Sequence, residues 1–324
     1  MDDQPWVSVI IPTYNRAKKV GAAIESVIRQ TYPNKQIIVV DDGSEDDTSF
    51  VVKAYPEVEY VYQDHAGQGA ARNTGLRRAA GKFIASLDSD DVWNADFLRH
   101  CVEFIQAHEL DFVFTNWFQQ SKGGEWMDAF SRYDFLKPYL TENKGKWILL
   151  DYSKLRKLYI RNIPSPSSSL VIRRSSIVAG WNEKMNIGDD VCLLLDMILA
   201  KECRAAFTME KLWTKQIDGS NIYDGRDTAE TIKLLDIEDN SLLIQRYRDQ
   251  LRKHEVRILR RKNATGIMAL AWHYLIRKRD VEEGRRMLKQ IATLNRGMVI
   301  SLLFRLFYHK CRYHLKKTVA LAKS

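Results

Sequence analysis

The N-terminal part of the chain alternates short apolar runs with segments of helical period. The apolar runs are rich in β-branched residues and lack a helical period, which predicts buried parallel strands. Apolar residues at helical spacing between these runs predict helices. Such an order needs right-handed crossovers, so we expect an α/β fold with a doubly wound, mostly parallel sheet flanked by helices. The predicted strands are Val7–Ile11, Ile37–Val40, Val58–Gln63 and Phe83–Leu87, and the predicted helices are Val20–Ile28, Thr48–Tyr55 and Gly69–Ala80.

The pattern is less regular further along the chain. Phe112–Phe118 alternates weakly, which predicts an edge or antiparallel strand, and Ser168–Arg173 predicts another strand. Gly188–Asp190 opens a predicted helix, whereas Gly123–Arg161 is aromatic and basic with little periodicity. From about Tyr223 the composition is helical. We therefore expect a catalytic domain over residues 1–222, with halves at about 1–118 and 119–222, and an α-helical basic C-terminal region over residues 223–324.

Polar side chains follow three of the predicted strands. Thr13 and Tyr14 follow the first, Asp41 and Asp42 the second, and an acidic cluster the fourth. Ligands of doubly wound sheets bind outside the carboxyl ends of the strands. Three polar clusters at one edge therefore predict a ligand site there.

The acidic cluster in FIASLDSDD comprises Asp88, Asp90 and Asp91. Burying such carboxylates unpaired would be costly, so they must face water or a cation. Alternation along an extended chain would place Asp88 and Asp90 on the same side, where oxygen ligands suit Mg²⁺ or Mn²⁺. The alternative is a polar turn before a helix that starts near Asp96. No Walker sequence is present to bind phosphate, and Arg72 is the nearest basic candidate.

Charge is unevenly distributed along the 324 residues, whose net charge is +9. From residue 241 onward, 21 Lys and Arg face 5 Asp and Glu, a balance of +16, while the first 240 residues carry 29 basic and 36 acidic groups, a balance of −7. The predicted terminal helix Met298–Lys317 aligns four basic residues on one stripe beside a broad apolar face. The stripe comprises Arg305, His309, Arg312 and Lys316, and the apolar face comprises Ile300, Leu303, Phe304, Phe307 and Tyr308. This pattern predicts either docking on an anionic membrane or packing on the catalytic domain.

The remaining bulk features indicate a cytoplasmic protein, peripheral on the inner face of the cell membrane if the tail docks there. The cysteines lack metal or redox spacing, which suggests reduced thiols. We find neither an N-terminal signal nor an apolar run of the roughly 20 residues that a membrane-spanning helix needs. The sequence carries no signal for an oligomeric state. The four cysteines are Cys101, Cys192, Cys203 and Cys311.

Four ordered motifs, VSVIIPTYNR, IIVVDDGSEDDT, GAARNTGLRRAAGKFIASLDSDD and GDDVCLLLDMI, resemble the family 2 glycosyltransferases with the GT-A fold. The resemblance covers about the first 220 residues. It implies an inverting, metal-dependent hexosyl- or N-acetylhexosaminyltransferase. Such an enzyme moves a sugar from a nucleotide donor, with UDP expected, to a hydroxyl of a glycan or lipid-linked glycan. Cell-surface polysaccharide or glycolipid assembly is the implied setting.

The resemblance also implies roles for individual residues on the donor side. Pro12, Thr13, Tyr14 and Asp42 would hold the nucleobase and ribose, with Asp42 accepting from the uracil imide N–H. Arg72 would face the base or the diphosphate.

The acidic motifs match the family's metal and base positions. Asp90 would be the direct ligand of Mn²⁺ or Mg²⁺, and Asp88 would contact the ribose or a metal-bound water. Asp190 would be the catalytic base, because an acceptor hydroxyl needs a carboxylate within hydrogen-bond reach. Supporting roles fall to Asp41, Asp91 and Asp189. The chain departs from the family pattern at Asp196, where Arg is usual, and at Trp213-Thr214-Lys215-Gln216, which only loosely matches an aromatic-Arg-x-His element.

Simpler interpretations exist for several of these residues. Tyr14 would cap the core, Arg72 would be a solvated helix cation, Asp41 would act as a helix N-cap-type acid, and Asp189 with Asp190 would cap their helix.

Two other functions are alternatives to a glycosyltransferase. A sugar-nucleotide pyrophosphorylase needs a Gly-rich basic loop after the first strand, which Pro12-Thr13-Tyr14-Asn15 is not. A nucleic-acid-binding protein using the basic tail would leave the acidic clusters unexplained, and the tail lacks the aromatic pattern of single-strand binders. We therefore expect no specific nucleic-acid partner.

Overall fold

The computed structural model describes residues 4–120, 124–140, 145–216, 227–278 and 280–294, together with Gly297, Ile300, Phe304, Phe307 and Tyr308. The chain divides into two compact units, Met1–Asp224 and Gly225–Ser324. The first unit contains the sheet and the predicted site, and the second is helical.

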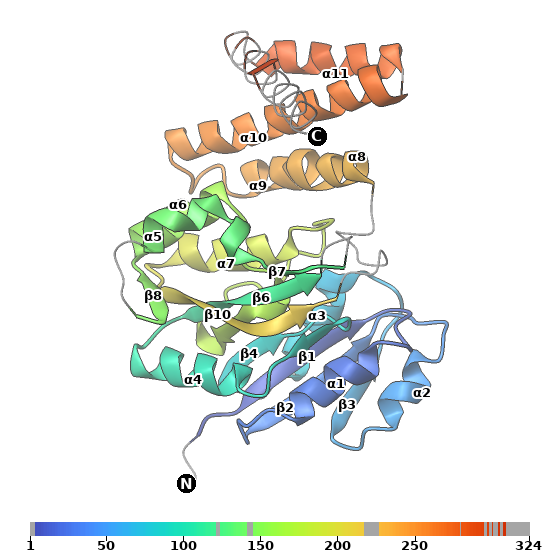
Figure 1. The fold of residues 1–324 in the computed structure, drawn as a ribbon, viewed down its shortest axis with the longest axis vertical. Helices are drawn as coiled ribbons and strands as arrows, with labels where there is room; N and C mark the ends of the chain where they lie inside the picture. The colour runs from blue at the N-terminus through green and yellow to red at the C-terminus, as the bar shows by residue number, and fades with distance from the viewer. Residues whose placement is uncertain are drawn as a thin grey trace, which may run out of the picture. The chain divides into compact units, whose positions relative to one another are not determined.

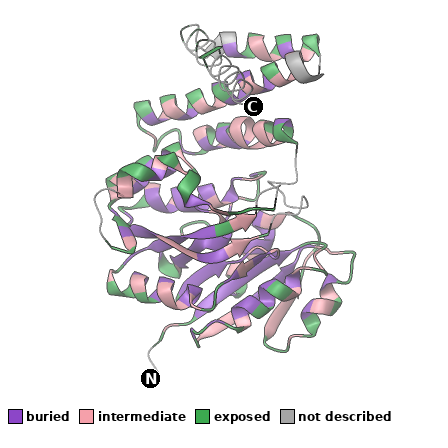
Figure 2. Cartoon of the chain, in the orientation of Figure 1, coloured by how far each residue is buried: buried purple, intermediate pink, exposed green. Residues whose placement is uncertain are grey.

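The first half of the sheet consists of four parallel strands in the order β3-β2-β1-β4. β1 and β2 are β-branched and buried along most of their length, as strands covered on both faces must be (Figure 2). The prediction of a doubly wound parallel sheet is confirmed in this half. The strands are β1 (Val7–Thr13), β2 (Lys35–Asp41), β3 (Val58–Tyr62) and β4 (Phe83–Ser86).

Helices cover both faces of this half (Figure 1). α1 and α2 pack on one face, whereas α3 connects β3 to β4 across β2 and β1 and lies on the other. α3 approaches β1 closely at Gly75, where an added Cβ would lie 2.4 Å from Ile10 Cγ2. The helices are α1 (Val20–Ile28), α2 (Thr48–Lys53), α3 (Gln68–Arg78) and α4 (Phe97–Ala107).

The second half of the sheet is mixed, and the full order is β3-β2-β1-β4-β9-β6-β10-β5. β9 is antiparallel to both β4 and β6, while β6 is parallel to β10. Phe112–Phe118 was expected to form an edge or antiparallel strand. The edge alternative is wrong, because β6 lies between β9 and β10, whereas the antiparallel alternative is confirmed by its pairing with β9 and β7. The strands are β5 (Asp91–Trp93), β6 (Phe112–Gln120), β7 (Trp126–Asp128), β8 (Trp147–Leu150), β9 (Leu170–Arg173) and β10 (Ala205–Lys215).

The segment that lacked periodicity contains a helix, α6, whose Leu155, Leu158 and Tyr159 are buried. The predicted helix at Asp189 is confirmed as α7. The helices of this part are α5 (Lys137–Leu140), α6 (Tyr152–Arg161) and α7 (Asp189–Ala200), and short 3₁₀ turns span Phe130–Arg132, Asp134–Leu136, Ser167–Ser169 and Arg174–Ser176.

The second unit is α-helical, as the composition predicted. Its core brings together Ala264, Ile267, Met268 and Ile291. No helix in the described residues is both long and apolar enough to cross a membrane. The basic stripe Arg305, His309, Arg312 and Lys316 lies outside the described residues. The helices are α8 (Thr228–Thr231), α9 (Asn240–Arg246), α10 (Lys253–Trp272) and α11 (Val281–Leu294), with π-helical segments at Ile232–Asp239 and His273–Lys278.

Candidate functional site

The carboxyl end of β1 presents one buried and one exposed polar side chain. Pro12 and Thr13 are buried, and within the described residues the hydroxyl of Thr13 has no hydrogen-bond partner. Tyr14 is 40% exposed, so it does not cap the core. Its ring instead stacks on His65, with 4.2 Å between the ring centroids. His65 has no counterpart among the residues that the sequence motifs indicated.

The two acids at the carboxyl end of β2, Asp41 and Asp42, have different surroundings. Asp41 is fully buried and accepts from the Ser44 backbone N–H at 2.9 Å and from the Tyr60 hydroxyl at 2.8 Å. It therefore closes the turn after β2, and the helix-cap interpretation is wrong, because α2 begins only at Thr48. A supporting role for Asp41 fits this position.

Asp42 organises the loop that follows β3. Its carboxylate accepts from the Gln63 amide at 2.6 Å and from the backbone N–H groups of Ala66 and Gly67 at 2.9 and 2.8 Å. His65 Nδ1 lies 2.9 Å from the second carboxylate oxygen. If the imide N–H of a nucleobase donates to Asp42, the carboxylate therefore accepts from it in addition to these donors.

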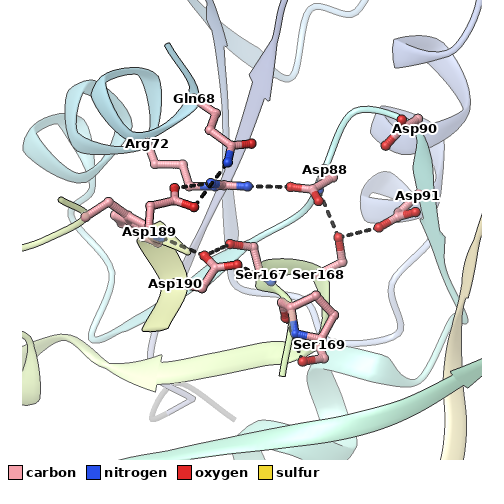
Figure 3. A network of polar contacts seen from close by, with 12 residues as sticks. Gln68, Arg72, Asp88, Asp90, Asp91, Ser167, Ser168, Ser169, Asp189 and Asp190 are labelled. Carbon is pink, nitrogen blue, oxygen red and sulfur yellow. Dashed lines mark hydrogen bonds and ion pairs between the residues drawn. The ribbon is translucent and has the colours of Figure 1, made fainter. Parts of the chain in front are cut away.

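Asp88 and Asp90 lie in the turn that connects β4 to β5, and Asp91 is the first residue of β5. The Asp91 backbone N–H donates to the Asp88 carbonyl at 3.0 Å, which closes the turn. The prediction that alternation aligns Asp88 and Asp90 is therefore wrong. Asp88 points toward Arg72, while Asp90 and Asp91 lie on the other side of the turn (Figure 3).

Burial and mutual repulsion raise the pKa values of two of these acids. Desolvation is the largest cause for Asp90, followed by the charge of Asp88. The pKa of Asp91 is raised well above its usual range by burial, and then by Asp88 and Asp90. Lys215 opposes both shifts, and Arg16 Nε lies 4.0 Å from Asp90.

This arrangement fits a divalent cation. A cation would offset the repulsion among the acids, and one oxygen of buried Asp91 has no hydrogen-bond partner within the described residues. Among the described residues, no group of three or more His, Cys, Asp or Glu side chains is arranged so that it could hold a metal ion by itself. Mg²⁺ in particular needs only one or two protein carboxylates when phosphate oxygens complete its coordination.

Arg72 connects the acidic turn to the start of α7. It is 2% exposed, so it is not a solvated helix cation. One guanidinium nitrogen lies 2.7 Å from Asp88 and the other 2.5 Å from Asp189 (Figure 3). Burial alone would lower the pKa of Arg72, but Asp189, Asp190 and Asp88 raise it overall. The guanidinium therefore stays charged between its two carboxylates.

Asp189 is buried behind Arg72 and also accepts from the Gln68 amide at 3.1 Å. Desolvation raises its pKa to about 7, and the charges of Asp190 and Asp88 add to this shift while Arg72 opposes it. Asp189 thus holds Arg72, which fits a supporting role.

Asp190 accepts hydrogen bonds from residues outside α7. The Ser167 backbone N–H donates at 3.0 Å, the Ser167 hydroxyl donates to the other oxygen, and Trp181 Nε1 donates at 3.1 Å. The interpretation that Asp189 and Asp190 merely cap α7 is therefore wrong, because their partners lie on other elements. Ser167 was not among the predicted site residues, because a Pro- and Ser-rich segment is typical of an exposed loop.

The fold is the GT-A fold of glycosyltransferases. Solved structures with a similar topology support this assignment. PcManGT, a mannosyltransferase from Pyrobaculum calidifontis in complex with GDP-Man and Mn²⁺, superposes with a TM-score of 0.57 at 19% identity and covers 95% of this chain and 81% of that one. S. aureus TarS 1-349 in complex with UDP-GlcNAc superposes with a TM-score of 0.56 at 18% identity over 89% and 92% of the two chains.

The family model for glycosyl transferase family 2 matches residues 8–178, so the chain belongs to this family. Among curated relatives, an Escherichia coli protein named UDP-Glc:alpha-D-GlcNAc-diphosphoundecaprenol beta-1,3-glucosyltransferase WfgD is 39% identical over 36% of this chain and 47% of its own length. The Bacillus subtilis putative teichuronic acid biosynthesis glycosyltransferase TuaG is 36% identical over 39% and 52%. An uncharacterized glycosyltransferase of Rickettsia felis is 38% identical, but only 21% of its length is matched. The chain thus spans between about a fifth and a half of these relatives.

Proposed function

We propose that this chain is a metal-dependent inverting glycosyltransferase that moves a sugar from a nucleotide donor to an acceptor hydroxyl in polysaccharide or glycolipid assembly. One observation carries the proposal. The acids after β4 and the acid pair at the start of α7 meet at a single network, although about 100 residues separate them in the sequence. A donor leaving group and an acceptor base are needed at the same place in such a reaction.

The donor lies along the carboxyl ends of β1, β2 and β4 in this proposal, within residues 1–118. Pro12, Thr13 and Tyr14 contact the nucleobase and ribose. The Thr13 hydroxyl, which has no hydrogen-bond partner in the described part of the chain, supports this assignment. Asp42 accepts from the base, and Asp88 contacts the ribose. Arg72 is proposed to face the base or the diphosphate of the donor, although both of its terminal nitrogens already contact carboxylates.

Asp90, with Asp88, is the proposed site for Mn²⁺ or Mg²⁺, and Asp91 supports it. The bound cation would supply positive charge that neutralises the leaving diphosphate. The raised pKa values of Asp90 and Asp91 support this assignment, because carboxylates that repel one another gain most from a cation.

Asp190 is the proposed base. It removes the proton of the acceptor hydroxyl while the oxygen attacks the anomeric carbon from the face opposite the leaving group, which inverts the configuration. Asp189 and Arg72 have a supporting role for this carboxylate. Residues 119–222 form the acceptor side.

The nucleotide is expected to be UDP, since the name of WfgD specifies UDP-Glc and TarS is seen with UDP-GlcNAc. A panel of UDP-sugars and GDP-sugars, assayed for slow hydrolysis with Mn²⁺, tests this. We expect release of UDP that EDTA abolishes and Mn²⁺ or Mg²⁺ restores. Turnover of GDP-sugars alone would overturn the choice of nucleotide, and full activity in EDTA would overturn the metal.

Asp190→Asn tests the base. Turnover should collapse while UDP affinity changes little, because the base acts on the acceptor and not on the donor. Asp134→Asn, at a carboxylate whose side chain is 85% exposed, is the matched control and should keep wild-type turnover. Weaker UDP binding with turnover retained would place Asp190 in the donor site and contradict its role as base.

The C-terminal region is proposed to contact the anionic inner face of the cell membrane. Ile300, Phe304 and Tyr308 are spaced four residues apart, and Phe307 lies three residues after Phe304; the four side chains are 62%, 74%, 64% and 69% exposed in that order. No Asp or Glu occurs from residue 295 to the end. Exposed apolar side chains in a wholly basic segment fit the headgroup region of anionic lipid.

Liposome co-sedimentation tests the membrane contact. The protein should pellet with anionic but not neutral vesicles, be released at high salt, and stop pelleting when truncated before Arg296. Equal pelleting of the truncated and intact chains would contradict the proposal.

A further inference from the structure

A buried turn of three serines, Ser167–Ser169, lies between the two acid groups of the site. We call it the serine turn. Each of its serines is at most 1% exposed. A run of hydroxyls in a protein interior needs internal partners, since an unsatisfied buried hydroxyl costs free energy. The partners of these hydroxyls therefore indicate what the turn does.

The sheet register brings the serine turn to the acids after β4. β9 follows the turn directly and is antiparallel to β4, with Ala85 opposite Val171. Continuing that register by three residues places Ser168 opposite Asp88. Accordingly, the Asp88 backbone N–H donates to the Ser168 hydroxyl at 3.1 Å. The turn is thus placed by strand pairing and not by its own sequence.

Each serine hydroxyl has a different partner (Figure 3). Ser167 donates through its hydroxyl and its backbone N–H to the two oxygens of Asp190. Ser168 donates to Asp91 at 2.6 Å. Ser169 donates to the carbonyl of Pro166, the residue just before the turn, at 2.7 Å. The first two serines of one short segment therefore contact the proposed base, Asp190, and the acidic turn, whereas the third contacts only the neighbouring backbone of the same segment among the hydrogen bonds given above.

We infer that the serine turn positions both halves of the reaction. Ser167 fixes the orientation of the Asp190 carboxylate, and Ser168 fixes the turn Asp88–Asp91. Both are positioning residues, because neither is placed in contact with the reacting atoms. The inference rests on the proposed function, in which Asp190 is the base and Asp88–Asp91 serves the donor and its cation.

The physical reason lies in the freedom of a short acidic side chain. Asp190 is not fully buried, so without a second donor its carboxylate is free to rotate about its side-chain torsions. Trp181 holds one oxygen, and Ser167 holds both. A carboxylate with both oxygens held presents its remaining lone pair in one direction, which is what proton removal from a bound hydroxyl requires.

Three single substitutions, Ser167→Ala, Ser168→Ala and Ser169→Ala, test the inference, because they remove the same atom from equally buried sites. Turnover of the best UDP-sugar gives kcat and KM, while calorimetry with UDP and Mn²⁺ gives binding without turnover. Ser167→Ala should lower kcat roughly 10- to 100-fold with KM and UDP binding unchanged, the scale of a hydrogen bond to a charged group. Ser168→Ala should raise KM and weaken Mn²⁺ binding about tenfold. Ser169→Ala, the matched control, should change neither.

Further variants separate positioning from stability. Thermal unfolding of all three variants checks that they remain folded at the assay temperature. Ser167→Thr keeps the hydroxyl and should keep most of kcat. Adding Ser167→Ala to Asp190→Asn should cause no further loss, because residues that act through one group are not additive.

The inference and the proposed function fail in different ways. If Asp190→Asn keeps turnover, the proposed base is wrong. If Asp190→Asn is inactive but Ser167→Ala behaves like Ser169→Ala, the base stands and the positioning role is overturned. Equal falls in kcat for all three alanine variants would show that the turn is only structural, which also overturns the inference.

Discussion

The two halves of the sheet place their functional groups in different ways. In the parallel half, each polar group follows its own strand, so Thr13, Asp42 and Asp88 reach one edge because β1, β2 and β4 run in the same direction. In the mixed half, Ser168 reaches the acidic turn because β9 is antiparallel to β4. Residues of a site that follow parallel strands can therefore be recognised in the sequence as repeated local motifs. The side chains that orient those residues cannot, because their position depends on pairing between distant segments.

The halves also differ in charge. The parallel half contributes the acids that repel one another, together with Arg72, the cation that joins them to α7. The mixed half contributes neutral donors from Ser167, Ser168 and Trp181. In addition to the pairing of β4 with β9, one buried cation and a few neutral hydrogen bonds therefore connect the halves at the site.

Removing Arg72 should have the largest effect on stability. Arg72→Ala leaves Asp189 buried without its cation, which should lower the free energy of unfolding by about 3–5 kcal/mol, as measured by urea denaturation. Arg77→Ala, at an exposed arginine of the same helix, is the control and should stay within about 0.5 kcal/mol of the wild type. Similar losses for both variants would show that Arg72 does not hold the halves together.

Neutralising Asp90 should have its main effect on activity. Asp90→Asn removes the proposed metal ligand, and turnover should fall about 10²- to 10³-fold, the scale of losing one electrostatic element of a site. Stability should be unchanged or slightly higher, because the variant relieves the repulsion with Asp88 and Asp91. Asp47→Asn, at an exposed carboxylate, should keep wild-type turnover. Unchanged turnover of Asp90→Asn at low Mn²⁺ would contradict the assignment.

The packing of α3 on β1 should be so tight that one added methyl group lowers the free energy of unfolding. Gly75→Ala places a Cβ 2.4 Å from Ile10 Cγ2, and this overpacking should cost about 1–3 kcal/mol of unfolding free energy. Gly69→Ala, in the same helix, meets nothing closer than 3.4 Å and should be nearly neutral. Thermal unfolding of the two variants distinguishes them, and equal stability would show that the parallel half tolerates movement of α3.

The smallest effect concerns an ion pair within the mixed half. Lys201 and Ser176 lie 2.5 and 2.6 Å from Asp111, and the Arg204 N–H lies at 2.8 Å. Burial acts to raise the pKa of Asp111, but these donors lower it overall from its ordinary value of 3.8. The stabilisation is therefore present above pH 3.8 and disappears as the pH falls through the lowered pKa.

Lys201→Met tests this ion pair by urea unfolding at pH 7 and pH 3. Because the Lys201 side chain is 47% exposed, the expected loss at pH 7 is only about 0.5–1 kcal/mol, and it should shrink at pH 3. A loss that is independent of pH would assign the effect to packing and not to charge.

The sequence by itself determined the parallel half of this protein. β-branched runs followed by helical segments allow few topologies, so a doubly wound parallel sheet over β1 to β4 and the clustering of Thr13, Asp42 and Asp88 at one edge were predictable. The start of α7 at Asp189 was also predictable, because an acidic pair before an apolar run is a local signal.

Only the tertiary structure decided how these groups are oriented. It showed that Asp88 and Asp90 lie in a turn, that β6 is central, and that Arg72 is buried between two acids. Ser168 illustrates the physical reason. Its hydroxyl reaches Asp91, 77 residues away, through a register between β4 and β9 that no local period specifies. Local patterns determine which elements form, but the partner of a buried polar group depends on which segments the folded chain brings together.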